Sequence, residues 1–185
     1  MTGQHDATVV DLLLRQHDEI RGLFATVEKS SGEARKQAFD HLRYLLAVHE
    51  TAEEEIVHPF ARRTIGNGER IIDARLKEEH EGKELLQQLE KEEDLDSAEF
   101  EATFGKLHTS VERHAEQEER LEFPEIADKA TPQQLKGMVA AVKAAEAVAP
   151  TRPHPGSESV TKNVVLGPLA SVVDRTRDAI RAAMR

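Results

Sequence analysis

The sequence predicts an all-α protein: an up-down-up-down four-helix bundle with a short fifth helix and a C-terminal helical extension. Apolar residues recur every three or four positions, which is the helical spacing, and they do not alternate with period two. The composition is rich in Ala, Glu, Leu, Lys and Arg, with one Tyr and no Trp, as is typical of helices. Breaker-rich segments divide the chain into helical stretches of about 20 to 30 residues, the length of bundle helices.

Four long helices are expected over residues 8–29, 33–63, 69–91 and 97–128. Segments rich in Ser or Gly end the first two, and an acidic stretch follows the third. The apolar stripe of the third helix is the least regular of the four. Because the connections are short, neighbouring helices are expected to run antiparallel and to form one bundle over residues 1–130.

Three further segments follow this bundle. Thr131-Pro132 has the residue types of a helix N-cap and first helical position, so a short additional helix is expected over residues 131–148. Residues 149–167 are rich in Pro, Gly and Ser and are interpreted as a linker. Residues 168–185 form an amphipathic, locally basic segment. We expect this segment to dock as a helix or to contact a protein partner.

The bulk composition excludes several classes of function. The chain of 185 residues contains no cysteine, which rules out disulfides, thiolate zinc sites, iron–sulfur clusters and thiol nucleophiles. Its formal net charge of -10 disfavours binding to nucleic acid or anionic lipid. No apolar run reaches the roughly 20 residues of a membrane span, and the N-terminus lacks the features of a secretion signal. A cytoplasmic location is therefore expected, and any metal must be held by His nitrogen and carboxylate oxygen.

Six polar residues occupy positions where the helical stripes call for Leu or Ile. They come from all four predicted bundle helices, and an antiparallel arrangement would bring them together at mid-height. Residues four apart share one face of a helix, so the two members of each His-x-x-x-Glu pair would point the same way. The six are His17, His49, Glu53, His80, His114 and Glu118.

Burial of these six groups without compensation would destabilise the domain severely. An unpaired buried polar group costs about 1–3 kcal/mol and an ionised carboxylate costs more, against a total stability of about 5–15 kcal/mol. No basic residue on the stripes could neutralise the two glutamates, so a metal-free polar network is disfavoured. Four nitrogens and two bridging carboxylates are too many for one tetrahedral zinc. They suit two octahedral-leaning ions, and imidazole with carboxylate favours iron.

At these residues the sequence resembles the hemerythrin-like, HHE cation-binding family. The resemblance implies that His17, His49, Glu53, His80, His114 and Glu118 are metal ligands, with the two glutamates as bridges. It implies a cofactor of two iron ions with an oxo or hydroxo bridge, and a small diatomic ligand or peroxide as partner. The matching segments, within about residues 8–128, are LLLRQHDEIRGLF, LLAVHETAEEEIVHPF, RLKEEHEGKELLQQL and VERHAEQEERLEFP.

One position departs from respiratory hemerythrins, which supply two histidines from the third helix. Here the second of these positions holds Glu84 or Lys83. A replacement nitrogen could come from His58, just before Pro59, but nine residues after His49 it faces away on an ideal helix. Reaching inward would require a local distortion. A surface or capping role is the favoured interpretation of His58, and a surface role that of Glu84, with metal coordination as the alternative for both.

The leading hypothesis is a non-haem di-iron protein that binds or reacts with hydrogen peroxide, O2 or NO. The order of ligands is similar to that of bacterial hemerythrin-like proteins, which include a mycobacterial type with catalase-like activity. No catalytic residue is assigned beyond the metal ligands. The alternative is a non-catalytic O2, NO or iron sensor, or an iron-storage protein, with signalling through the C-terminal segment. A ferritin-like carboxylate enzyme is less favoured, because that fold needs two Glu-x-x-His motifs and only Glu55/His58 fits.

Overall fold

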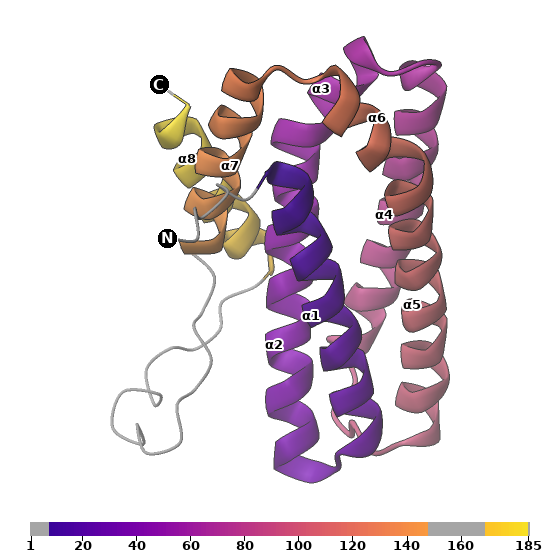
Figure 1. Cartoon of the computed structure of the whole chain (residues 1–185). Helices are drawn as coiled ribbons and strands as arrows, with labels where there is room; N and C mark the ends of the chain where they lie inside the picture. The colour runs from indigo at the N-terminus through magenta and orange to yellow at the C-terminus, as the bar shows by residue number, and fades with distance from the viewer. Residues whose placement is uncertain (1–7, 148–168, 185) are drawn as a thin grey trace, which may run out of the picture.

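The computed structural model describes residues 8–147 and 169–184, and every regular element within these ranges is a helix (Figure 1). The predicted fold class is confirmed. Four long helical columns form the bundle, and two of them contain a short π-helical segment, labelled η. The columns are α1 (Val9–Lys29); α2 (Gly32–Ala52) with η1 (Glu53–Val57) and α3 (His58–Thr64); α4 (Gly68–Leu89); and α5 (Ala98–Gln117) with η2 (Glu118–Glu122) and α6 (Phe123–Lys129).

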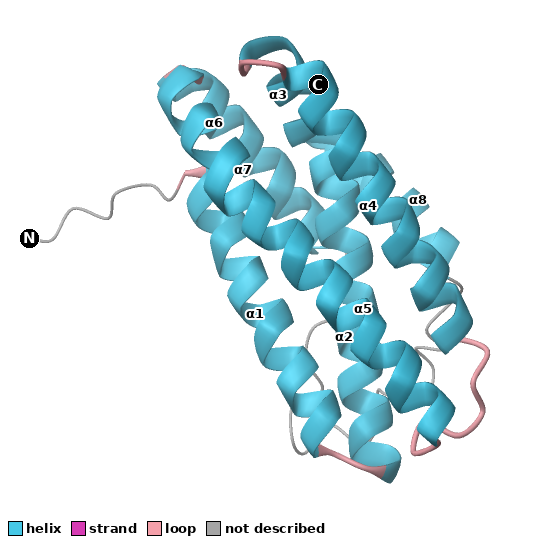
Figure 2. Cartoon of the chain, turned by 90° about the vertical axis from the view of Figure 1, so that its right-hand side faces the viewer, coloured by secondary structure: helices cyan, strands magenta, loops and turns pink. Residues whose placement is uncertain are grey.

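Two further helices, α7 (Pro132–Ala147) and α8 (Leu169–Ala183), lie beside the half of the bundle that contains α3 and α6 (Figure 1). α7 contacts α1 and α2, and α8 contacts α2 and α7. The view in Figure 2 shows the described chain as helices joined by loops. The linker predicted over residues 149–167 lies outside the described residues. Among the described helices, none is both long and apolar enough to cross a lipid bilayer.

Local sequence explains where α1, α5 and α7 begin. The hydroxyl of Thr8 accepts a hydrogen bond from the amide of Asp11, whose carboxylate accepts one from the Thr8 amide in return, so α1 starts with a capping box. Ser97 caps α5 by accepting from the amide of Phe100 at 3.0 Å. Thr131 caps α7 in the same way. Each cap satisfies an amide that has no partner within its helix.

The buried apolar residues in the described ranges form two separate clusters. One is built from α1, α2, α4 and α5 and includes the stacked rings of Phe100 and Phe104, whose centroids are 5.5 Å apart. The other joins α1 and α2 to α3, α6, α7 and α8. Between these clusters lies a layer of buried polar side chains, among them His17, His49 and Glu118. The bundle is therefore apolar towards both ends and polar across its middle.

The tight turn before α4 provides a test of the fold. A Cβ on Gly68 would lie 2.6 Å from the carbonyl oxygen of Ala61 and 2.7 Å from that of Arg62, so the backbone would have to shift. We expect Gly68→Ala to lower the free energy of unfolding, measured by urea denaturation, by about 1–3 kcal/mol. The control is Gly105→Ala on α5, where a Cβ meets no atom within 4 Å, and it should raise stability by about 0.4–1 kcal/mol. Equal effects of the two substitutions would contradict this close approach.

Candidate metal centre

Two π-helical turns at equivalent places in the second and fourth columns shape the site. Each begins at the glutamate of a His-x-x-x-Glu pair, Glu53 in η1 and Glu118 in η2. The amide of His58 donates to the carbonyl of Glu53, and that of Phe123 to the carbonyl of Glu118. Because a π turn holds one more residue than an α turn, residues five apart come onto one face. η1 thereby turns His58 into the interior, where it is 2% exposed. The surface role favoured for His58 is wrong, and the required distortion is this π turn.

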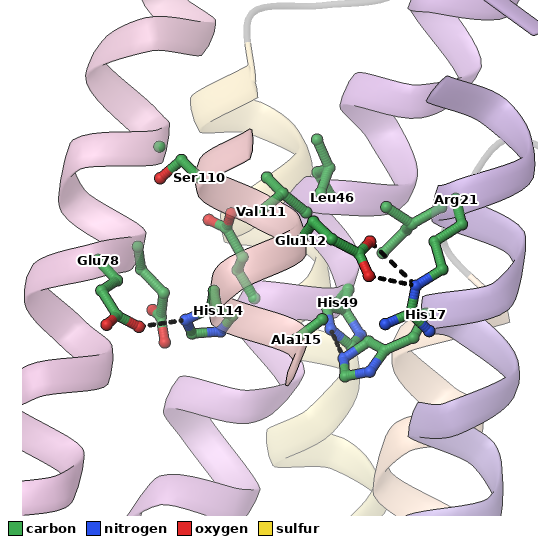
Figure 3. Close-up of a pocket in the computed structure, with 14 residues that line it drawn as sticks. His17, Arg21, Leu46, His49, Glu78, Ser110, Val111, Glu112, His114 and Ala115 are labelled. Carbon is green, nitrogen blue, oxygen red and sulfur yellow. Dashed lines mark hydrogen bonds and ion pairs between the residues drawn. The ribbon is translucent and has the colours of Figure 1, made fainter. Parts of the chain in front are cut away.

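His17 on α1 and His49 on α2 face each other, with their Nε2 atoms 3.1 Å apart (Figure 3). Each ring is held by its other nitrogen. Nδ1 of His17 lies 2.8 Å from an oxygen of Glu119, and Nδ1 of His49 lies 2.7 Å from the amide oxygen of Gln16. An acceptor at Nδ1 fixes the tautomer that leaves a lone pair on Nε2, which is the usual arrangement of a metal-binding histidine.

Glu53 and Glu118 lie at the centre of the polar layer and are 0% exposed. Among the residues described, none donates a hydrogen bond to any of their four oxygens. Glu53 directs Oε1 at Nε2 of His49 (3.3 Å) and Oε2 at Nε2 of His114 (3.9 Å). Glu118 directs Oε2 at Nε2 of His17 (3.4 Å) and Oε1 at Nε2 of His114 (3.2 Å). Each carboxylate thus spans two groups of imidazoles, as a ligand bridging two ions would.

Further donors lie on the His114 side of the central carboxylates. His58 places Nε2 3.5 Å from Oε1 of Glu118 and 4.0 Å from Oε1 of Glu122, while its Nδ1 is 3.4 Å from Oε1 of Glu79. Glu79 and Glu122 are 3% and 0% exposed, and their oxygens accept no hydrogen bond within the described part of the chain. The sequence prediction included neither glutamate.

The expectation that His80 faces the interior is wrong. Its side chain is 74% exposed and contacts that of Glu84, which is 64% exposed, on the surface of α4. The interior position is Glu79, one residue earlier. The predicted stripe was irregular because it passed through the half-exposed Leu76 and His80 and skipped the polar members of the true stripe. That stripe keeps the three-four spacing of a bundle helix. Counting alternately three and four residues from Leu89 towards the N-terminus identifies it in the sequence. Its members are Ile72, Arg75, Glu79, Gly82, Leu86 and Leu89.

In the fourth column, too, the residues that face the interior differ from those of the predicted apolar stripe. Leu121, three residues after Glu118, is 42% exposed, whereas Glu122 is buried. η2 explains the exposure of Leu121, because its wider turn carries the third residue after Glu118 off the inner face. Glu122, the fourth residue, stays on the face that residues four apart share. Glu55 of the ferritin-like motif is directed outward and contacts Arg177 of α8 at 2.9 Å. That motif therefore does not bring both of its residues into the cluster.

The electrostatics of the cluster favour the binding of a cation. Burial lowers the pKa of His49 to about 4, so its ring is neutral near pH 7. Burial alone would raise the pKa of Glu118, but its contacts with His114 and other imidazoles outweigh it and hold that pKa well below the usual range. Burial, reinforced by neighbouring carboxylates, raises the pKa of Glu79 to about 10 and that of Glu122 to about 7. Carboxylates whose ionised form is disfavoured in this way gain strongly from a nearby cation.

A small cavity lies against the imidazoles of His17, His49 and His114 (Figure 3). Apolar side chains of α1, α2 and α5 form part of its wall, together with Arg21 and Glu112. Nε of Arg21 lies 3.0 Å from both oxygens of Glu112, which ties α1 to α5 beside the cavity. The volume is about 20 Å³, roughly the space that one water-sized molecule needs. A molecule that reaches the imidazoles through this cavity must be small.

The donor set fits a pair of metal ions. Left unsatisfied, each buried donor or acceptor would cost about 1–3 kcal/mol, and cations satisfy carboxylate oxygens and imidazole lone pairs together. All predicted ligands except His80 meet in this cluster, and their coordination of metal stays a prediction. Within three subsets the donor atoms lie within 4.8 Å of one another. These are His17, His49, Glu53 and Glu118; Glu53, His58 and Glu79; and His58, Glu118 and Glu122.

The chain is similar to known proteins in both sequence and structure. The family model of the hemerythrin HHE cation binding domain matches residues 8–126. The crystal structure of a hemerythrin HHE cation binding domain-containing protein from Mycobacterium kansasii matches with a TM-score of 0.66 at 20% sequence identity, covering 95% of this chain and 98% of that chain. At this identity the likeness shows the fold alone. Comparison with curated proteins gives no match.

The placement of His58 and His80 can be tested by metal binding. We expect His58→Ala to weaken the binding of one ion by at least about 10-fold, since changes around a metal site have effects of this size or larger. His80→Ala should leave binding unchanged, because this side chain is on the surface. Elemental analysis of both variants after desalting gives the comparison. Loss of metal from the His80 variant, with retention by the His58 variant, would contradict the geometry.

Proposed function

Because the chain belongs to the hemerythrin HHE cation binding domain family, we propose that it holds two iron ions that bind or react with a small oxidant, namely hydrogen peroxide, O2 or NO. The observation that carries this proposal is the orientation of Glu53 and Glu118. Each directs its two oxygens at different imidazoles. A carboxylate placed in this way can join two ions at a distance where both act on one small ligand. The expected place of action is the cytoplasm.

The donor chemistry supports iron as the metal and two as the number of ions. The donors are imidazole nitrogens and carboxylate oxygens without sulfur, a combination that suits iron. Four imidazoles and four carboxylates offer more donors than the six positions of one octahedral ion. When bound, iron supplies a change of oxidation state that these side chains do not themselves provide.

The residues around the donors hold them in place and restrict access. Gln16 fixes the ring of His49, and its own amide donates to Glu146 of α7 at 2.9 Å. Glu119 fixes the ring of His17. The cavity of about 20 Å³, roughly the space of one water-sized molecule, favours a small ligand over a larger organic substrate. We assign no protein acid or base, so the reactive groups are the ligands and what they bind.

A sensor is the second candidate, and one observation favours it. Arg177 of α8 lies 2.9 Å from Glu55 and 3.4 Å from Glu54, the two residues that follow Glu53 in η1. A change of position at Glu53 would reach α8 through these ion pairs, and α8 could pass it to a protein partner. Iron storage is less favoured, because the cavity has no room for a store of many ions.

Turnover of peroxide tests the enzymatic form of the proposal. We expect the iron-loaded protein to release O2 from hydrogen peroxide, measured with an oxygen electrode, with two peroxide molecules giving one O2 and two waters. His49→Ala and His114→Ala should lower iron content, thermal stability and O2 release together. Metal at 100 times its dissociation constant raises the free energy of unfolding by about 2.7 kcal/mol. The variants should lack a stabilisation of this size.

The matched control for these variants is His80→Ala, which removes an exposed histidine and should retain all three properties. If the native, iron-loaded protein releases no O2, the enzymatic reading fails. Iron retained in full by both the His49 and the His114 variants would count against the metal centre itself.

Hydrogen exchange of α8 tests the sensor. If the protein signals through this helix, iron loading or oxidant should change the amide exchange of residues 169–183 in the native chain. Arg177→Ala should abolish that change while iron content stays the same, because the ion pairs to η1 are lost. If neither iron nor oxidant changes the amide exchange of α8, signalling through this helix is excluded.

A further inference from the structure

The donors around Glu53 and Glu118 divide into two unequal groups. One group consists of these two carboxylates and two imidazoles. The other consists of the same two carboxylates, two different imidazoles and two further carboxylates. The first is called subsite A and the second subsite B. Subsite A consists of His17, His49, Glu53 and Glu118; subsite B consists of His58, His114, Glu79 and Glu122 with the same two central carboxylates.

Glu79 and Glu122 are directed into subsite B and are not satisfied by other groups. They are 3% and 0% exposed, and neither accepts a hydrogen bond from a residue in the described ranges. Besides the ring of His58, Lys83 is a candidate partner for Glu79. However, its Nζ lies 3.8 Å from Oε2 of Glu79 and pairs more closely with Glu54. These two enclosed carboxylates lie beside the ring nitrogens of His58, which also form no hydrogen bond in the described ranges. A bound cation would satisfy the carboxylates and the imidazole together.

Charge balance leads to the same conclusion. Two divalent ions bring four positive charges into an enclosed site, and Glu53 and Glu118 supply only two negative charges. Glu79 and Glu122 bring the total to four. A buried site in which the charges cancel avoids most of the desolvation cost that an uncompensated charge would carry. Both additional charges lie on the side of His58, so the ion in subsite B has more oxygen donors than the ion in subsite A.

We propose that Glu79 and Glu122 are ligands of the ion in subsite B, and that they make it a site for a hard divalent cation such as Mn²⁺. Carboxylate oxygen suits Mn²⁺, whereas imidazole suits iron and the later metals. Subsite A, with two imidazoles and two oxygens, discriminates against Mn²⁺. The two ions of the centre are therefore bound unequally, and subsite B can hold a metal different from that in subsite A. This inference rests on the proposed two-ion centre.

Binding of Mn²⁺ to the full, metal-stripped chain tests the inference, with the electron paramagnetic resonance signal of free Mn²⁺ as readout. We expect one tight Mn²⁺ per chain. Glu79→Gln and Glu122→Gln should each weaken it by at least about 100-fold, since loss of an outer partner alone costs about 10- to 100-fold. The matched controls are Glu84→Gln on the outer face of α4 and Glu125→Gln on α6, exposed carboxylates whose loss should leave Mn²⁺ binding unchanged.

Thermal unfolding separates a ligand from a residue that only supports the fold. In the presence of chelator, the two buried Gln variants should be at least as stable as the native chain, because each replaces a buried carboxyl group that has no hydrogen-bond partner in the described ranges. On addition of Mn²⁺ the native chain and both controls should gain stability, and the buried variants should not. Equal loss of stability with and without Mn²⁺ would assign Glu79 and Glu122 a structural role and overturn the proposal.

The failure of this inference is distinguishable from failure of the proposed function. If the native chain binds two iron ions but the Gln variants take up Mn²⁺ as the native chain does, only the assignment of Glu79 and Glu122 falls. If the native chain binds neither iron nor Mn²⁺, the two-ion centre itself falls.

Discussion

Two carboxylates enclosed in a helical core, Glu53 and Glu118, impose the constraint on which the rest of this structure depends. Removing an ionised carboxylate from water costs several kcal/mol even after the protein relaxes. The fold must therefore surround both with groups that carry or attract positive charge. It directs imidazoles at them from α1, α2, α3 and α5. The apolar clusters on either side hold this polar layer at the middle of the bundle.

The π turns connect the fold to the site. A straight helix after Glu53 would turn His58 outward, and a straight helix after Glu118 would keep Leu121 on the inner face beside Glu122. The two turns are equivalent in position but carry different residues. η1 delivers His58, whereas η2 delivers Phe123, which stacks on His17 with ring centroids 5.5 Å apart. The resulting centre is polar and acidic on one side and apolar on the other, and the inequality of the two proposed subsites follows from this difference.

The helices beyond the segment that matches the family model also reach the centre. Glu146 of α7 holds Gln16, which in turn holds the ring of His49. Arg177 of α8 contacts Glu54 and Glu55 in η1. The first contact ends on Gln16, the residue before His17, and the second ends on Glu54 and Glu55, one and two residues after Glu53. The additional helices thus support the proposed metal centre, and a change at either helix has a short route to the donors.

The sequence by itself determined the all-α class, the main helices and the two His-x-x-x-Glu pairs, because polar residues at regular helical spacing among apolar ones are a local signal. The tertiary structure decided the rest of the site. It placed Glu79 inside and His80 outside, because α4 buries a stripe whose polar members carry no apolar signal. It turned His58 inward and Leu121 outward through π turns that helical spacing does not predict. The physical reason is that the rotation of a helix about its axis is fixed by the helices packed against it, and an inner face that carries polar residues is only weakly marked by apolar ones.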